Sequence, residues 1–164
     1  MQPLNNTHQE DVSQFMVTCK QWDGETLLST PVPSNLEELN TYKLRLKLCI
    51  EETFELFEAM LTPEAYQPFQ YILDQLNIKI ELLSNKDMNI NPVEVFDSLV
   101  DQEYVNLGFA NLLGLDMTEG FREVHSSNMT KLDENGQPIF REDGKLLKSN
   151  LYTPPDLNKV YNKE

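Results

Sequence analysis

The sequence predicts an all-α protein, a bundle of four to five helices with a small C-terminal hairpin or extended tail. Apolar residues recur at helical spacings of three and four along several long segments. Each of these segments begins at a capping residue or at a proline suited to the first helical turn. Two dipeptides that favour tight turns, Asn135-Gly136 and Asp143-Gly144, lie close together near the C-terminus and place the hairpin there.

Size and charge restrict the class of protein. The chain has 164 residues, of which 40% are hydrophobic, enough for one compact domain with its own core. Its 27 acidic residues outnumber the 13 basic ones, and the net charge of −14 disfavours binding to nucleic acid or to anionic membranes. No apolar run approaches the roughly 20 residues of a membrane span, and the N-terminus lacks the features of a signal peptide. We therefore expect a cytoplasmic protein with no nucleic-acid or membrane partner.

We expect residues 1–164 to form a single domain with three parts. Residues 1–33 contribute an N-terminal helix and a connection that contains glycine and proline. Residues 34–127 form the helical core, and residues 128–164 form the tail.

The first helix is expected to begin at Thr7 and Glu10, which have the spacing of a capping box, and its apolar positions include Cys19. Trp22 follows in the connection, where we interpret it as a hydrophobic anchor. Cys19 and Cys49 both occupy apolar helical positions without a CxxC partner. This pattern indicates two buried thiols in a reducing compartment.

The second helix is predicted to begin at the capping-box pair Ser34 and Glu37 and to end near Leu61. Its core face is expected to be a stripe of residues three or four positions apart: Leu39, Tyr42, Leu46, Cys49, Thr53, Phe57 and Met60. The carboxylates of the same helix lie at other angles around the axis.

Glu51, Glu52 and Glu55 form an acidic face on this helix. Glu51 and Glu55 are about 40° apart around the helix axis and Glu52 and Glu55 about 60° apart, so the three carboxylates converge beside the helix. Such a cluster repels itself unless a cation or solvent intervenes. The residues alone leave two interpretations open, a wall for a divalent cation or a solvated helix surface.

A third helix is predicted from Thr62 and Pro63 to about Leu83, and a fourth from Asn91-Pro92 to Gly114. Four polar side chains share one face of this fourth helix, at spacings of three and four: Glu94, Asp97, Asp101 and Tyr104.

This second acidic face could oppose the first and enclose hard divalent cations between two helices. Glu94 has an alternative interpretation, because a carboxylate at the third helical position can accept a hydrogen bond from the N–H of Asn91 as a capping-box partner. Asp97 is harder to explain structurally, since aspartate is a poor helix former.

A shorter fifth helix is predicted from Asp116 and Glu119 to about Ser127. Beyond the two turn dipeptides, the residues from Ser149 contain Pro154-Pro155 and are expected to run extended. Four basic residues lie between these elements and could contact phosphates singly: Lys131, Arg141, Lys145 and Lys148.

Five sequence blocks occur in order along the chain: EExxE at 51–55, ExxD at 94–97 followed by Asp101 and Tyr104, EVHSSNMTKL at 123–132, DGKxxK at 143–148 and YTPPDL at 152–157. Together they resemble the all-α nucleoside triphosphate pyrophosphohydrolases, which include MazG, the dimeric dUTPases and phosphoribosyl-ATP pyrophosphohydrolase. The resemblance extends from about Arg45 to Leu157 and is closest to the small stand-alone phosphoribosyl-ATP pyrophosphohydrolase-like branch. The connection between Glu55 and Glu94 is longer than is usual in the family, and we expect it to affect the pocket rim and the choice of substrate.

The resemblance implies a magnesium-dependent hydrolase, with manganese as an alternative metal, that splits a nucleoside triphosphate between its α and β phosphates. It assigns catalysis to Glu51, Glu52 and Glu55, with Glu51 acting on the attacking water. It assigns the metal to Glu52, Glu55, Glu94, Asp97 and Asp101. It assigns contacts with the substrate to Tyr104 and His125 and to the tail, through Asn128, Lys131, Lys145 and Lys148.

The resemblance also implies a nucleotide as the substrate and a homodimer or a dimer of dimers as the assembly. For a short chain that carries no fused biosynthetic domain, we expect nucleotide-pool control or housecleaning, with a pyrimidine deoxynucleoside triphosphate preferred over phosphoribosyl-ATP. A phosphoribosyl-ATP pyrophosphohydrolase is one alternative. A non-catalytic helical interaction protein, whose carboxylates are only surface charge, is an alternative from a different class.

Overall fold

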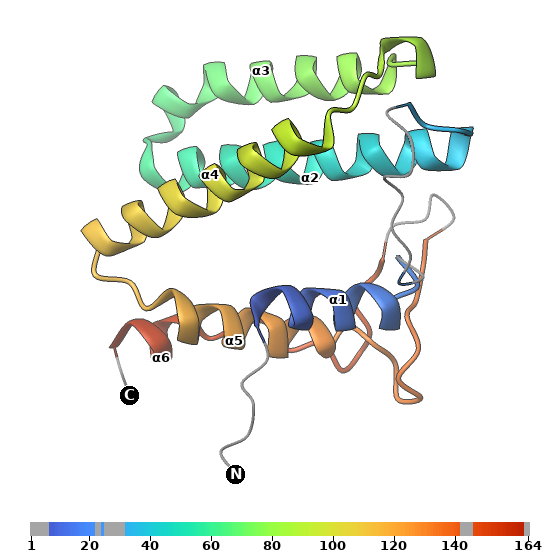
Figure 1. The fold of residues 1–164 in the computed structure, drawn as a ribbon. Coiled ribbons are helices and arrows are strands. Elements are labelled where there is room, and N and C mark those ends of the chain that lie inside the picture. The colour runs from blue at the N-terminus through green and yellow to red at the C-terminus, as the bar shows by residue number, and fades with distance from the viewer. Residues whose placement is uncertain (1–6, 22–23, 25–31, 142–145, 163–164) are drawn as a thin grey trace. The chain divides into compact units, whose positions relative to one another are not determined.

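The computed structural model describes residues 7–21, 24, 32–141 and 146–162. Within these residues the chain is all-α, as predicted (Figure 1). The described helices are α1 (His8–Thr18), α2 (Leu36–Met60), α3 (Pro63–Glu81), the short 3-10 helix η1 (Asn85–Asp87), α4 (Pro92–Leu112), α5 (Met117–Met129) and α6 (Leu157–Asn162).

The chain divides into two compact units. The α2–α3 unit contains Thr26–Asp97, and the α5 unit combines Met1–Glu25 with Ser98–Glu164. Helix α4 begins in the α2–α3 unit and continues into the α5 unit without interruption. The single-domain arrangement stays a prediction.

Helices α2 and α3 form an antiparallel pair because only Leu61 and Thr62 connect them (Figure 1). The Thr62 hydroxyl accepts a hydrogen bond from a backbone N–H in the first turn of α3, so this residue caps the helix as predicted. Phe57 packs between Phe54 of its own helix and Phe69 of α3, with ring centroids 5.8 and 5.2 Å apart. Phe54 is buried, and full burial of a side chain of this size stabilises a fold by roughly 1.5–3 kcal/mol.

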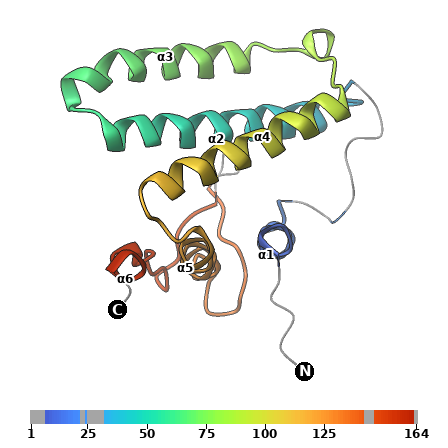
Figure 2. The same ribbon diagram turned by 60° about the vertical axis from the view of Figure 1, so that its left-hand side comes forward.

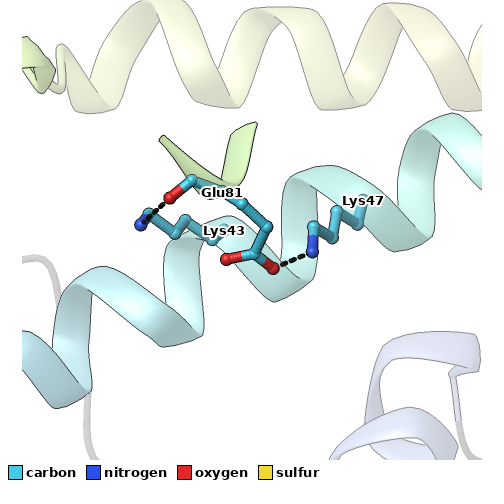
Figure 3. A network of polar contacts seen from close by, with 3 residues as sticks. All are labelled: Lys43, Lys47 and Glu81. Atoms are coloured by element: carbon cyan, nitrogen blue, oxygen red, sulfur yellow. Dashed lines mark hydrogen bonds and ion pairs between the residues drawn. The ribbon is translucent and has the colours of Figure 1, made fainter. Parts of the chain in front are cut away.

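A lysine cluster closes the other end of the α2–α3 pair (Figure 3). Lys43 is buried, and its ammonium donates to the main-chain oxygen of Glu81 at 2.8 Å. Lys47 lies one turn further along α2 and forms an ion pair with the carboxylate of the same Glu81. The hydrogen bond from Lys47 to the Glu81 carboxylate, together with the charges of Lys47 and Lys43, holds the pKa of Glu81 below its ordinary value. Both lysines thus stabilise the carboxyl end of α3, where the helix dipole is negative.

The predicted core stripe of α2 is correct only in part: Leu39 is buried and Phe57 packs on Phe69 of α3, but Leu46 and Thr53 are exposed. The buried side chains of α2 include Leu39, Lys43 and Phe54, which places the packed face roughly 60° from the expected stripe. Met60, at the end of the stripe, is 60% exposed, and Cys49 is exposed rather than buried. The physical reason is that apolar residues occur on several sides of α2, so the partner helix, not the periodicity, decides which side is buried. Both cysteines are free, and Cys19 alone confirms its predicted burial.

Helix starts follow the predicted caps with one shift of register. Thr7 and Glu10 form the expected capping box of α1, with the Thr7 N–H donating to Glu10 at 2.6 Å. At α2 the cap is Asn35, and Ser34 donates to Glu38 rather than to Glu37. The helix therefore begins one residue later than the sequence pattern predicts.

In the α5 unit, α1 packs beside α5 (Figure 2). His8 at the start of α1 stacks on Phe121 of α5, with ring centroids 3.9 Å apart and nearly parallel planes. At the other end of α1, Cys19 is fully buried, and Leu132, just beyond α5, is buried as well. These contacts give the N-terminal helix a fixed position on α5.

The region after α5 contains the first of the two predicted turns. Asp133 accepts hydrogen bonds from the N–H groups of Asn135 and Gln137, both at 2.8 Å, and closes the turn that contains Gly136. Phe140 and Leu146 form an isolated antiparallel bridge. The second predicted turn, at 143–144, lies outside the described residues.

The extended tail is predicted correctly only as far as Asp156. Helix α6 follows at Leu157–Asn162 and packs against α5. Asp156 accepts a hydrogen bond from the N–H of Lys159 at 3.3 Å and so caps this helix. The prediction of an extended tail followed the two prolines and did not consider this capping residue. Trp22 lies outside the described residues. No helix in the described part of the chain is both long and apolar enough to cross a membrane.

Candidate functional site

The carboxylates of α2 lie at the edge of the α2–α3 pair. Glu52 and Glu55 are exposed and Glu51 is half-buried, while Phe54 between them is buried. Glu55 also acts on Tyr66 of α3: burial, followed by the charges of Glu58, Glu55 and Asp74, raises the pKa of the Tyr66 hydroxyl. The Tyr66 hydroxyl therefore senses a negative potential beside the acidic face of α2.

The carboxylates of α4 keep one face because the helix is continuous. Glu94, Asp97 and Asp101 are all exposed, and Tyr104 one turn later is 78% exposed. Glu94 and Asp97 belong to the α2–α3 unit, whereas Asp101 and Tyr104 belong to the α5 unit.

The structure does not support the capping role considered for Glu94. The side chain of Asn91 accepts a hydrogen bond from the N–H of Val93 at 3.1 Å, so Asn91 supplies the local polar contact itself. In the described part of the chain, no hydrogen bond joins Glu94 to the Asn91 N–H. Glu10 and Glu38, in contrast, accept such bonds at the starts of α1 and α2. The helix start leaves the Glu94 carboxylate available for another contact.

The described residues do not include a preformed metal site. Residues 7–21, 24, 32–141 and 146–162 contain no group of three or more His, Cys, Asp or Glu side chains arranged to hold a metal ion. The chemistry of the donors nevertheless fits magnesium or manganese, because all the candidates are hard carboxylate oxygens and neither cysteine nor histidine interrupts them. The metal site therefore stays a prediction.

Of the expected substrate residues, Asn128, Lys131 and Lys148 are described and lie in or near the end of α5. Segment 149–153 is hydrogen-bonded to the last turn of α5 and to the residues that follow it. The buried Ser127 hydroxyl donates to the Thr153 carbonyl at 2.7 Å, and the Thr153 N–H donates to the Thr130 hydroxyl at 2.9 Å. Ser149 donates through its hydroxyl to the carbonyls of Leu132 at 2.7 Å and Thr130 at 3.2 Å.

The charges of Lys131 and Lys148 both act on Tyr152, a residue that was not among the predicted site residues. The Lys148 ammonium lies 4.4 Å from the centroid of the Tyr152 ring, and the Lys131 ammonium lies 5.8 Å from that of Phe15. The contact with the Ser127 hydroxyl, followed by the charges of Lys148 and Lys131, lowers the pKa of Tyr152. Tyr152 therefore senses a positive potential in an otherwise strongly acidic chain.

The remaining substrate candidates divide between described and undescribed positions. His125 and Asn128 are half-buried in the last turns of α5, and the Asn128 carbonyl accepts a hydrogen bond from the Lys131 N–H at 3.1 Å. Lys145 lies outside the described residues. Tyr104 belongs to α4 and is not part of this network.

Two of the sequence blocks prove to be one structural feature. Glu123, which opens the EVHSSNMTKL block, accepts a hydrogen bond at 2.8 Å from the N–H of Asp156 in the YTPPDL block. The signal for Tyr152 and Ser127 was therefore present, since each lies in one of these blocks. Only the pairing of the two blocks in space shows that the two residues meet.

The helical fold, the two acidic faces and the paired lysines are features of a phosphate-handling hydrolase class. The chain belongs to the phosphoribosyl-ATP pyrophosphohydrolase family, whose profile matches residues 24–128. Its fold is similar to the crystal structure of a provisionally assigned NTP pyrophosphohydrolase from Exiguobacterium sp. 255-15. That structure shares 25% identity with a TM-score of 0.61, over 97% of this chain and 99% of that chain. A comparison with curated proteins found no match. Both similarities support a pyrophosphohydrolase type of function.

The long connection between the two acidic motifs, Glu55 to Glu94, is also accounted for. It contains the end of α2, the whole of α3 and the short helix η1. Most of it is therefore the partner helix of α2 and not a loop.

Proposed function

We propose that the chain is a divalent-metal-dependent nucleoside triphosphate pyrophosphohydrolase that releases a nucleoside monophosphate and pyrophosphate. The observation that carries this proposal is the family match, which spans 24–128 and so includes both acidic faces. The exposure of Glu55, Glu94 and Asp97 supports it, because carboxylates that stabilise no helix start are available to a ligand. Magnesium or manganese, when bound, would neutralise the triphosphate so that an acidic site can accept it.

The roles of the residues follow the family's motifs. Glu52, Glu55, Glu94 and Asp97 would hold the metal, and Asp101 would support them. Glu51 would orient the attacking water and accept its proton, while the bond between the α and β phosphates breaks and pyrophosphate leaves. His125 and Asn128 would contact the substrate from α5, and Tyr104 from α4.

For the substrate, we propose a pyrimidine deoxynucleoside triphosphate in preference to phosphoribosyl-ATP. Helix α3 supports this choice, since it occupies the connection that is long for the family and would form one side of a base pocket next to α2. The test is a panel of purified nucleotides with magnesium, in which pyrophosphate and orthophosphate are scored separately. Pyrophosphate as the first product supports the proposed reaction, and orthophosphate as the first product contradicts it.

The rival is a non-catalytic helical protein of the same fold. Magnesium on the order of millimolar distinguishes the two, because an ion that binds only the folded state raises the melting temperature. A metal-binding enzyme should show this rise, and replacing Asp97 by asparagine should remove it. An unchanged melting temperature in the wild-type chain would favour the rival.

We also propose that the chain assembles as a homodimer, or as a dimer of dimers, through the outer face of α3. Tyr71, Ile78 and Leu82 follow one another at spacings of seven and four, and they are 66%, 55% and 78% exposed. Tyr71 and Ile78 in α3, and Leu82 at its C-cap, lie on the side away from the buried residues Tyr66 and Ile80. A row of exposed apolar side chains on one helix is typical of an interface between copies.

Sedimentation tests this assembly directly. The wild-type chain should sediment at twice its 19.0 kDa mass or more, and Ile78→Glu should shift it towards the monomer. Lys79→Gln is the matched control, because it changes the net charge equally at the neighbouring position, about 100° around the helix. A wild-type mass of 19.0 kDa at micromolar concentration would contradict the proposal.

A further inference from the structure

His8, the first residue of α1, stacks on Phe121 of α5 within the α5 unit. The two ring planes are inclined by 13°, and the ring centroids are 3.9 Å apart. In this geometry one flat aromatic ring covers the face of another. Both residues are half-buried, so the stack is not part of a closed core. The α5 unit therefore contains a phenyl face that accepts a planar ring with nitrogen atoms.

Phe121 lies on the same face of α5 as two of the predicted substrate residues. His125 and Asn128 follow it at spacings of four and three, which places the three side chains along one stripe of the helix. At a rise of 1.5 Å per residue, Phe121 and His125 are about 6 Å apart along the helix axis. A ring stacked on Phe121 would therefore lie next to a substrate that His125 and Asn128 contact.

Helix α1 is held differently at its two ends. At its start the stack joins His8 to Phe121, and just beyond its last turn Cys19 is fully buried. Within α1 itself, which the structure describes in full, no side chain is buried. The capping box of Thr7 and Glu10 is internal to α1 and would move with the helix. The stack can therefore open by a tilt of α1 about its Cys19 end.

A purely structural role for His8 as an anchor explains only part of this arrangement. A stacked ring pair contributes a modest attraction, equivalent to a roughly two- to tenfold change in an equilibrium constant. An aliphatic side chain at position 8 would cover the phenyl face without bringing polar nitrogen atoms to it. A nucleobase is planar, aromatic and rich in nitrogen, as imidazole is, but its face is larger. A base would therefore compete with His8 for the same side of Phe121.

We propose that the ring of Phe121 is the stacking platform for the base of a bound nucleotide, and that His8 occupies this platform until a base displaces it. When the base stacks on Phe121, α1 tilts away at its His8 end. The family match at 24–128 includes the platform but not the helix that covers it. The inference rests on the proposed function only for the kind of ligand, a nucleotide. A single phenyl face stacks on every base, so the platform binds the base without choosing among bases.

The first test is calorimetric binding of deoxynucleoside monophosphates to the full chain without magnesium, compared with the base-free 2-deoxyribose 5-phosphate. Phe121→Leu keeps an apolar side chain but removes the ring. It should weaken nucleotide binding roughly fivefold or more and leave the weaker binding of the sugar phosphate unchanged. His8→Ala should strengthen nucleotide binding roughly two- to tenfold, because imidazole no longer competes with the base. Equal effects on both ligands, or no gain in the His8 variant, would overturn the platform.

Two matched controls separate the platform from general effects of substitution. Gln9→Ala changes the exposed neighbour of His8, about 100° around α1. Phe140→Leu removes an exposed ring elsewhere in the same unit. Neither variant should alter nucleotide binding, and a loss in Phe140→Leu equal to that in Phe121→Leu would contradict the platform. Absence of nucleotide binding to the wild-type chain would overturn it as well.

A second measurement follows the His8 ring itself by proton NMR. The chain has two histidines, so the imidazole C–H signals of His8 are identified by their absence in His8→Ala. Stacking on Phe121 shifts these signals upfield through the ring current of the phenyl group. A saturating nucleotide should return them to the position of a free imidazole, and the sugar phosphate should leave them unchanged. Signals that stay upfield with the nucleotide bound would overturn this inference alone, whereas displacement of His8 without any hydrolysis would contradict only the proposed function.

Discussion

Two tyrosines show that the two units of the chain have opposite local potentials. Tyr66 in the α2–α3 unit is buried beside Glu58, Glu55 and Asp74, and its pKa is raised. Tyr152 in the α5 unit contacts Ser127 and two lysines, and its pKa is lowered. The same functional group therefore reports a negative region in one unit and a positive region in the other.

The difference arises from which charges each unit uses for its own stability. In the α2–α3 unit, Lys43 and Lys47 both bind Glu81, and the acidic face of α2 remains exposed. In the α5 unit, Glu123 and Asp133 accept backbone hydrogen bonds, and the lysines at 131 and 148 remain without ion pairs among the described residues. The exposed charges of the α2–α3 unit include the carboxylates of Glu55 and Glu94, whereas in the α5 unit the Lys148 ammonium lies beside the Tyr152 ring.

The largest effect is expected where carboxylates proposed to hold the metal are removed. Glu52→Ala or Asp97→Ala should reduce turnover by about 100-fold or more, because each removes a group proposed to act at the reacting phosphate. The fold should survive, since both side chains are exposed. Pyrophosphate release measures turnover, and circular dichroism measures helix content.

Glu103→Ala is the control for the α4 change. Glu103 lies on the same exposed helix, about 120° around the axis from Asp97, and should keep its turnover. Loss of helix content in the Asp97 variant would mean that this carboxylate stabilises the fold. Asp97 would then not be a charge that is available to a ligand.

A smaller but sharper effect is expected for Glu94→Gln. The amide keeps the size of the side chain and its ability to accept a hydrogen bond, so a capping role would survive the change. We expect turnover to fall about tenfold or more, together with a weaker dependence on magnesium, and the melting temperature to stay the same. Retained turnover with an unchanged metal dependence would exclude Glu94 as a ligand.

The sequence allowed the helices to be predicted because their starts are local. Thr62 and Asp116 each cap the helix that follows by accepting a hydrogen bond from the N–H three residues later. A contact over so few residues can be recognised from the sequence alone. The packed face of α2 was predicted only in part, because Leu39 lies on the expected stripe whereas Lys43 and Phe54 are buried outside it. No periodicity of α2 itself contains that information. Burying a lysine at position 43 also contradicts the usual preference of its residue type.

The candidate site was predictable in its acidic half and not in its basic half. Glu51, Glu52 and Glu55 share a face through helical spacing alone. Lys131 and Lys148 meet at Tyr152 only because Ser149 bonds back to Lys131, a tertiary contact across a turn of variable length. Whether the two acidic faces join around a metal depends on the placement of whole helices, which residue spacing does not determine.

The lysine cluster of the α2–α3 unit provides a moderate stability test. Lys43→Ala should lower the free energy of unfolding by about 2 kcal/mol, because it removes a charged donor to the Glu81 carbonyl and the packing of the buried stem. Lys47→Ala removes a partly exposed ion pair and should cost no more than about 1 kcal/mol. Urea denaturation of both variants measures the difference. Equal costs would show that burial adds nothing to the Lys43 contact.

The smallest effect, and the most direct test of the opposite potentials, is the alkaline titration of the two tyrosines. The raised pKa of Tyr66 means that its unfolded form ionises first, so its contribution to stability is lost as the pH rises past the ordinary tyrosine value near 10. The lowered pKa of Tyr152 has the reverse consequence: its contribution is present above that value and is lost as the pH falls through the folded pKa. Tyr66→Phe should therefore flatten the alkaline loss of stability, and Tyr152→Phe should steepen it. In the absorbance titration of the folded chain, Tyr66→Phe should remove a late component and Tyr152→Phe an early one. If both variants removed titration components at the same pH, the local potentials at Tyr66 and Tyr152 would not differ. The charges of Lys131 and Lys148 would then not act on Tyr152.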